Sequence, residues 1–201
     1  MKEGKLLKFL FFVGVLSSLS FLFTACQESE DKTQFGIFKV LDSKTVEMDG
    51  EINRSTLNNF NRLIERYPNV DKINMMEVPG SSDDEINLLV SKKVHQNNIN
   101  THLMEDGLIA SGGVDFYLAG ITRTKGNNSQ IGVHSWSDGT NEATDFPRGH
   151  SNHQPYIDYY ISVGFSLADA EDFYYFTIDA APAASIHWMT ESEIAQYNIL
   201  Q

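Results

Sequence analysis

The chain has 201 residues, of which 41% are apolar and 21% are charged, a composition typical of one globular domain with a sizeable buried core. Its formal net charge of −12 argues against a nucleic-acid-binding protein, because the phosphate backbone would repel it. The single cysteine excludes a disulfide within the chain.

The first 26 residues have the layout of a secretory signal peptide. Three lysines precede an apolar run over residues 9–23, which is too short for a comfortable transmembrane span, and Thr24-Ala25-Cys26 follows. The small residues before Cys26 resemble a bacterial lipoprotein box, so we expect Cys26 to be lipidated and to begin the mature protein. The alternative is a plain signal peptide, or an uncleaved anchor with an incidental cysteine.

Residues 27–34 are polar and acidic, which predicts a disordered tether between Cys26 and a domain over residues 35–201. Without residues 1–26 the chain has 12 basic and 26 acidic residues, a net charge of −14. Membrane contact is therefore expected through the lipid alone. The predicted location is the bacterial cell envelope, with the lipid-anchored domain on the periplasmic face or the cell surface.

The period of the apolar residues predicts alternating strands and helices. Tyr67-Pro68 ends one helix, because proline forces the preceding residue out of the α region, and Ser82 to Glu85 has the spacing of a capping box. In chain order, the expected elements are strands over 35–40 and 46–48, a helix over 55–67, a strand over 72–78, a helix over 82–94, a strand over 98–104, a turn over 105–107, a helix over 110–121, a strand over 130–134, a polar loop over 135–154, helices over 156–164 and 167–177, and a short helix from 190.

Strands and helices alternate in units of about thirty residues, which favours parallel strands joined by right-handed crossovers. The predicted fold class is therefore α/β. We find no internal repeat and no low-complexity tract in the sequence.

Two glycine-containing loops follow predicted strands, namely Val78-Pro-Gly-Ser-Ser82 and Ile109-Ala-Ser-Gly-Gly113. Backbone amides from two neighbouring loops can hold a developing oxyanion. His134 ends the next strand, and a serine at a helix start beside such a histidine is the minimum for a base-activated nucleophile. The structural alternatives are a helix cap for Ser111, a turn glycine at position 80 and an ordinary strand-end histidine.

Taken in order, these residues resemble the Clp protease proteolytic subunit and its relatives in the crotonase-like superfamily, which include small secreted proteins. The resemblance spans roughly residues 45–200. Four segments support it: Met75-Glu-Val-Pro-Gly-Ser81 is similar to the family's strand and Pro-Gly-Gly loop, Ala110-Ser-Gly-Gly113 to its nucleophile turn, Gln130-Ile-Gly-Val-His134 to its base-bearing strand, and Trp188-Met-Thr-Glu-Ser-Glu-Ile-Ala-Gln-Tyr-Asn198 to its closing segment.

The resemblance implies stacked ββα units with a parallel sheet and crossover helices. It also implies Ser111 as the nucleophile, His134 as the general base, and an oxyanion hole made by the Gly112 amide and that of Gly80 or Ser81. Asp179 lies near the place of the family's third triad residue.

Two features depart from the family pattern. Ser81 replaces the second glycine of the oxyanion loop. Asp83 and Asp84 follow closely, and their charge would oppose an oxyanion unless they point to solvent.

The predicted function is a membrane-anchored, secreted serine hydrolase that cleaves a peptide or small acyl substrate through an acyl-enzyme. It needs no cofactor and no metal, and the resemblance implies rings or trimers. The alternatives are a non-catalytic lipoprotein with a binding or scaffold domain, and chemistry on coenzyme A thioesters. His150 and His153 are expected in a solvated loop that covers the cleft, and the aromatic run over residues 173–176 is expected in core packing.

Overall fold

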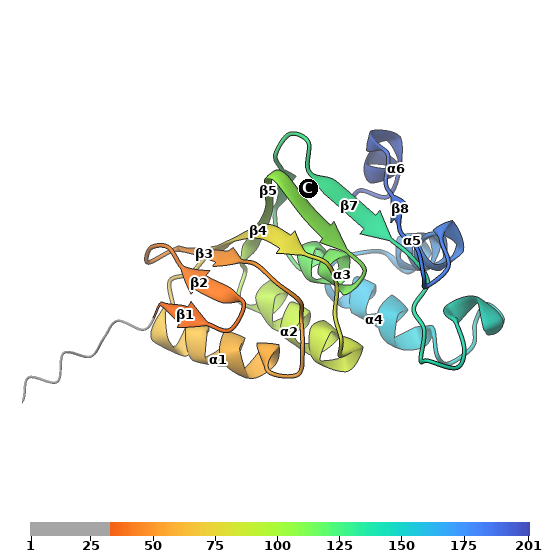
Figure 1. The fold of residues 1–201 in the computed structure, drawn as a ribbon, viewed down its shortest axis with the longest axis horizontal. Coiled ribbons are helices and arrows are strands. Elements are labelled where there is room, and N and C mark those ends of the chain that lie inside the picture. Colours follow the sequence, from red (N-terminus) through yellow and green to blue (C-terminus); the bar gives the residue numbers. More distant parts are fainter. Residues whose placement is uncertain (1–32) are drawn as a thin grey trace, which may run out of the picture. The chain divides into compact units, whose positions relative to one another are not determined.

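The computed structural model describes residues 33–201 (Figure 1). The predicted signal peptide, the lipidation site at Cys26 and the tether up to residue 32 lie outside the described residues. Gln34, which the sequence placed in the tether, pairs with Lys39 in the sheet, so the folded domain includes it. No helix within residues 33–201 has the length and apolar character needed to cross a membrane.

The centre of the domain is one mixed, mostly parallel sheet, which confirms the predicted α/β class. The strands are β1 (Gln34–Phe35), β2 (Phe38–Val40), β3 (Thr45–Met48), β4 (Lys72–Val78), β5 (Asn100–Ala110), β6 (Arg123–Lys125), β7 (Gln130–Val133) and β8 (His187–Trp188). Their order is β1-β2-β3-β4-β5-β7-β8, and β6 also pairs with β5. The pairs from β3 to β7 are parallel, whereas β1, β2 and β8 add antiparallel edges.

Helices connect the strands as the sequence predicts. They are α1 (Thr56–Arg66), α2 (Asp84–Gln96), α3 (Gly112–Leu118), a 3-10 turn η1 (Ala143–Asp145), α4 (Gln154–Ser162), α5 (Leu167–Ala180) and α6 (Glu191–Gln196). Figure 1 shows α1, α2 and α4 together on one side of the sheet. The α1 helix ends before Pro68, and α2 begins where the Asp83 side chain accepts a hydrogen bond from the Ile86 amide at 3.1 Å.

The core lies between the sheet and these helices. Ile73, Met75 and Val78 alternate along β4 with almost no exposed surface, and Phe60 and Leu63 of α1 are buried in the same cluster. Burial of each such side chain contributes about 1.5–3 kcal/mol. This packing holds the ends of the parallel strands, where the candidate site lies.

The β5 strand is longer than predicted. The sequence placed a turn at residues 105–107 and a helix from residue 110, but β5 continues to Ala110. It pairs with β4 up to Leu103 and again from Leu108, and the intervening residues form a bulge with Asp106 at a φ of 56°. Because the helix starts only at Gly112, Ser111 occupies the junction between strand and helix.

The loop over residues 135–154 is also more ordered than predicted. His153 is buried, and its Nδ1 lies 2.7 Å from the hydroxyl of Tyr174 while its Nε2 lies 3.3 Å from the carbonyl oxygen of Phe146. The expectation of a solvated loop is therefore wrong at His153, because the rings of Tyr174 and Tyr175 from α5 pack against its ring. The short strands β6 and β8, with three and two residues, gave no sequence pattern long enough to detect.

Candidate active site

Ser111 has a backbone conformation that ordinary residues rarely adopt. Its φ is 51° and its ψ is −130°, which lies outside both helical wells. Its side chain caps no amide of α3, and its own amide donates to the Gly132 carbonyl at 3.0 Å. Ser111 is therefore the N-cap residue of α3 by position, in a sharp strand-to-helix turn, but its side chain makes no capping hydrogen bond.

The two glycines after Ser111 allow α3 to pack tightly against the neighbouring loop. A Cβ atom at Gly113 would lie 2.2 Å from the Val78 carbonyl oxygen, and one at Gly112 would lie 2.5 Å from the Ser81 hydroxyl oxygen. Neither position admits a side chain without backbone movement. The Gly-Gly pair thus brings the start of α3 against the end of β4.

The loop after β4 presents an amide toward this turn. Ile52 donates to the Gly80 carbonyl and accepts from the Ser82 amide, both at 2.9 Å, in a parallel bridge with Ser81. In such a bridge the N–H of the residue between the two bonds faces the opposite side, so the Ser81 amide faces away from Ile52. Within residues 33–201 we find no acceptor for the Ser81 or Gly112 amide.

Gly80 takes the unusual conformation of this loop. Its φ is +150°, and a Cβ atom there would lie 3.2 Å from Cβ of Ser111. Ser81 has no positive φ, so the departure from the family's second glycine does not strain the loop. The Gly80 amide likewise has no acceptor within residues 33–201, so both predicted oxyanion donors of this loop are available.

His134 follows β7 on the neighbouring strand. Ala110 pairs with Gly132, so β5 and β7 end at the same edge of the sheet, and Ser111 and His134 line one pocket. The structure thus brings together the predicted nucleophile and base. Ser111 Oγ makes no hydrogen bond to His134 or to any other group within residues 33–201.

The environment of His134 keeps its ring neutral. Burial lowers its pKa below the usual value, although the backbone of Ala183 and Ser135 and the carboxylates of Asp84 and Glu142 partly oppose this. Its Nδ1 is buried and has no hydrogen-bond partner within the described residues. A neutral histidine is the form that can accept a proton.

Asp179 does not lie with these residues. It is exposed on α5, where its Oδ2 accepts a hydrogen bond from Nη2 of Arg148 at 2.8 Å. The guanidinium of Arg148 in turn lies over the ring of Tyr175, 4.4 Å from the ring centroid. Asp179 does not line the pocket, so the structure brings together a Ser-His pair without this acid.

The pocket beside Ser111 is open to solvent on one side and has a volume of about 40 Å³. Its walls come from α2, α3, β7, α4 and α5. The lining residues are Asp84, Ser111, Gly112, Val114, Asp115, Val133, His134, Trp136, Tyr156, Tyr160, Tyr174, Thr177 and Ile178. Two of them are acids: Asp84, which the sequence indicated only as a charge near the oxyanion loop, and Asp115, which sequence reasoning did not assign to the site.

Asp115 is a buried carboxyl on α3. Its Oδ1 accepts a hydrogen bond from the Tyr160 hydroxyl at 2.7 Å, and its Oδ2 lies 3.5 Å from Nδ2 of Asn87. Its pKa is raised to about 7, mainly by burial and also by the charge of Asp84, although the Tyr160 hydrogen bond acts in the opposite sense. An acid inside an otherwise apolar helical run, Val114 to Ala119, was the available signal for such a site.

Asp84 takes part in the same pocket. Its carboxylate accepts hydrogen bonds from the hydroxyls of Ser81 and Tyr156, the latter at 2.7 Å. Burial raises the pKa of the Tyr156 phenol, which therefore stays protonated as a donor. Asp83 caps α2 instead, so only one of the two acids after the loop adds charge to the pocket.

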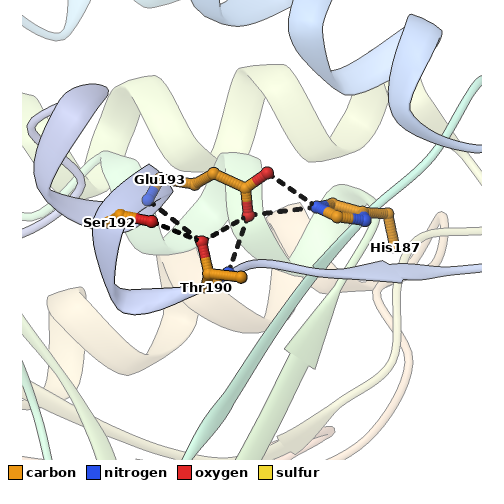
Figure 2. A network of polar contacts seen from close by, with 4 residues as sticks. All are labelled: His187, Thr190, Ser192 and Glu193. Carbon is orange, nitrogen blue, oxygen red and sulfur yellow. Dashed lines mark hydrogen bonds and ion pairs between the residues drawn. The ribbon is translucent and has the colours of Figure 1, made fainter.

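A second grouping of serine, histidine and acid lies near the C-terminus (Figure 2). Nε2 of His187 lies 3.1 Å from both carboxylate oxygens of Glu193, which also accepts from the Thr190 amide at 2.7 Å. Ser192 contacts the Thr190 hydroxyl at 2.9 Å rather than the histidine. These contacts form the capping box of α6 and join it to β8, away from the pocket.

The described residues offer no metal centre. Within residues 33–201 no group of three or more histidine, cysteine, aspartate or glutamate side chains is arranged to hold an ion. The buried His153 uses both ring nitrogens for contacts inside the protein.

Comparison with known proteins shows which solved structures share this fold. No protein-family model and no curated protein matches the chain. Among solved structures, a mutant of the 1510-N membrane-bound stomatin-specific protease in complex with a substrate peptide has a TM-score of 0.51 at 18% identity, covering 77% of this chain and 71% of the other. Another mutant of that protease has a TM-score of 0.51 at 17% identity, with 77% and 75% coverage.

ClpP1 from Listeria monocytogenes has a TM-score of 0.50 at 18% identity, covering 79% of this chain and 89% of its own. At such identities the likeness concerns the fold alone. The described chain therefore has the α/β fold of the Clp-protease-like proteins, as its sequence motifs predict.

Proposed function

We propose that the protein is a serine hydrolase, and specifically a peptidase, in which Ser111 and His134 act together. The observation that carries the proposal is the positive φ of Ser111 in a strand-to-helix turn, within the same pocket as a neutral, partly buried histidine. Such a turn exposes the hydroxyl and directs the following amide to the same side. A serine that served only the fold would have no reason to hold this strained conformation.

His134 accepts the proton of Ser111 Oγ as the oxygen attacks the carbonyl carbon of the substrate. The Gly112 and Ser81 amides donate to the oxyanion that forms. Protonated His134 then gives the proton to the leaving amine, and an ester on Ser111 remains. Water, deprotonated by His134, hydrolyses that ester and restores both residues.

The Ser-His hydrogen bond is expected to form when substrate fills the pocket. Catalytic hydrogen bonds often lengthen in unliganded enzymes and tighten in the reactive complex. The backbone of Ala183 and Ser135 favours the protonated ring of His134, which helps this residue to accept the serine proton.

We also propose that Cys26 anchors the protein by lipid to the bacterial cell envelope, on the periplasmic face or the cell surface. The basic start, the apolar run and the residues before Cys26 support this. Incorporation of an alkyne-tagged fatty acid into the expressed full chain, and its loss in Cys26→Ala, is the expected result. Incorporation that persists in Cys26→Ala would contradict the anchor.

The second candidate is a binding or scaffold domain without catalysis. The observation that favours it is the absence of any hydrogen bond to Ser111 Oγ, together with the unpartnered Nδ1 of His134 within the described residues. In that case the pocket would hold a ligand without covalent chemistry.

A reactive-serine experiment separates the two candidates. The full chain in detergent is treated with a dilute fluorophosphonate probe, and the adduct is located by mass spectrometry. We expect labelling at Ser111 that is lost in Ser111→Ala and in His134→Ala but kept in the matched controls Ser192→Ala and His187→Ala. A folded protein without an adduct at Ser111 would refute the hydrolase and favour the binding domain.

A further inference from the structure

The pocket beside Ser111 is lined by two acids and by no lysine or arginine. Asp84 is exposed and Asp115 is buried, so the two carboxyls mark its outer and inner parts. Neither acid forms an ion pair with a lysine or arginine within residues 33–201, and the only donors found for their carboxylates are hydroxyls and the amide of Asn87. A carboxylate shielded from water is stabilised most by a cation, which this pocket lacks.

The remaining walls suit a long side chain with an apolar stem. The ring of Tyr156 stacks between Trp136 and Tyr174, with centroid distances of 6.3 and 5.6 Å. Tyr160 adds a further ring beside Asp115. Lysine and arginine place methylene groups against such surfaces while their charged ends reach polar partners.

We propose that this pocket selects a lysine or arginine side chain on the residue whose carbonyl Ser111 attacks. The inference rests on the proposed hydrolase and names its substrate class. The aromatic rings contact the methylene stem, and Asp84 and Asp115 bind the ammonium or guanidinium group. These two acids are specificity residues rather than members of the Ser-His pair.

The charge of the pocket also affects the oxyanion. Asp84 is bonded to the hydroxyl of Ser81, whose amide is a proposed oxyanion donor, so its negative charge disfavours a second negative charge nearby. A substrate cation beside Asp84 offsets that charge while the oxyanion forms. A cationic substrate is therefore expected to gain in kcat as well as in binding.

The other substrate classes fit less well. A glutamate side chain would add a third carboxyl to the pocket and be repelled. A leucine side chain would contact the rings but would remove water from Asp84 without replacing the lost hydrogen bonds. The order expected for cleavage is therefore lysine or arginine first, leucine next and glutamate last.

The test uses four peptide amides that differ only in the residue before the cleaved bond: lysine, arginine, leucine or glutamate, each with the same fluorescent amine as leaving group. The enzyme is the full chain in detergent, with Asp84→Asn, Asp115→Asn and the matched control Glu85→Gln, an exposed acid next to Asp84 that lies outside the pocket. We expect kcat/KM for lysine and arginine to exceed that for leucine by about tenfold or more, given the energy of one close charge pair. This preference should fall to about twofold in Asp84→Asn and persist in Glu85→Gln.

A binding measurement keeps the inference separate from the hydrolase proposal. Fluorescence anisotropy of the labelled lysine and leucine peptides is measured on Ser111→Ala, alone and combined with Asp84→Asn. If no peptide is cleaved but the lysine peptide binds more tightly in an Asp84-dependent way, the pocket assignment holds and the hydrolase fails. Cleavage without a cationic preference overturns the pocket assignment and leaves the hydrolase intact, and equal binding of both peptides also overturns it.

Because Asp115 is buried, the kinetics of Asp115→Asn are interpreted only if this variant unfolds cooperatively on heating, which shows that it is folded. Asp84 lies at the exposed side of the pocket, so Asp84→Asn alone decides the outcome if the Asp115 variant does not fold.

Discussion

His134 and His187 occupy opposite kinds of environment in the same domain. His187 contacts both carboxylate oxygens of Glu193, within a capping box that also satisfies the Thr190 amide (Figure 2). His134 has a buried Nδ1 without a partner in the described residues, and burial lowers its pKa. The first histidine is held by an acid of the fold, whereas the second has no such partner and retains the capacity to accept a proton.

The acids of the two regions differ in the same way. The pKa of Glu193 lies below its usual value. The hydrogen bond from the Thr190 amide is the main cause, and the contacts from the Thr190 hydroxyl and His187 add smaller effects. Asp115, in the same pocket as His134, lacks a cation, and its pKa is raised to about 7, mainly by burial. Stable folding explains the first arrangement but not the second, because an uncompensated buried acid costs free energy.

The largest difference is expected from removing each histidine in turn. His134→Ala should lower Ser111 labelling and peptide cleavage by about 10²–10⁴-fold, the usual loss when a general base is removed. His187→Ala should leave both activities within about threefold, because it lies outside the pocket. Rates of labelling and cleavage check this, and equal losses in the two variants would contradict the proposed roles.

The buried acid should make stability depend on pH. Between pH 3.8, the ordinary pKa of the carboxyl, and about 7, folded Asp115 holds a proton that the unfolded chain has lost. The free energy of unfolding should therefore fall as pH rises through this interval, by at most on the order of 4 kcal/mol, and then level off.

Urea unfolding at several pH values between 4.5 and 8 measures this slope. Asp115→Asn should lose it and gain stability relative to the wild type as pH rises. Asp158→Asn, which removes an exposed acid of α4, serves as the control and should keep the slope. A slope that survives in Asp115→Asn would assign it to another group.

Mutations in the network of Figure 2 should change the free energy of unfolding but not the labelling of Ser111. Thr190→Ala removes the side-chain half of the capping box and should lower the free energy of unfolding by about 1 kcal/mol. Because the pKa of Glu193 is lowered, the stability that this acid adds is present above pH 4.5 and is lost as the acid is protonated below it. Chemical denaturation measures both effects, and a change in Ser111 labelling in this variant would argue against separate regions.

The smallest effect is expected at Asp179. Its exposed ion pair with Arg148 is worth about 0–1 kcal/mol, and it lies outside the pocket, so Asp179→Asn should change cleavage by less than about threefold. Steady-state kinetics with the lysine substrate test this. A loss as large as that of His134→Ala would instead make Asp179 the third member of the triad, as the family resemblance implies.

The sequence predicted the parts of the site that depend on local pattern. Gly80, Ser111 and His134 each lie just after the end of a parallel strand, and the parallel order of those strands follows from the alternation of strands and helices. Composition and spacing were therefore sufficient to bring these three residues to one edge of the sheet.

The missed parts depend on contacts between distant segments. Asp115 gains its burial and its hydrogen bond from Tyr160, which lies 45 residues further along the chain. Asp84 likewise meets Tyr156 at a separation of 72 residues. Similarly, Asp106 and Gly107 predict a turn by their residue types, but pairing with β4 on both sides turns them into a bulge within β5.

The conformation of Ser111 lowers the stability of the folded chain in exchange for the position of its hydroxyl. A φ of 51° with a ψ of −130° costs a residue with a side chain about 1–3 kcal/mol, whereas glycine adopts it without this penalty. Ser111→Gly should therefore melt at a higher temperature than Ser111→Ala, although both lack the hydroxyl. Glycine at this position would make the fold more stable, so the serine hydroxyl comes at a cost in folding free energy that packing alone does not explain.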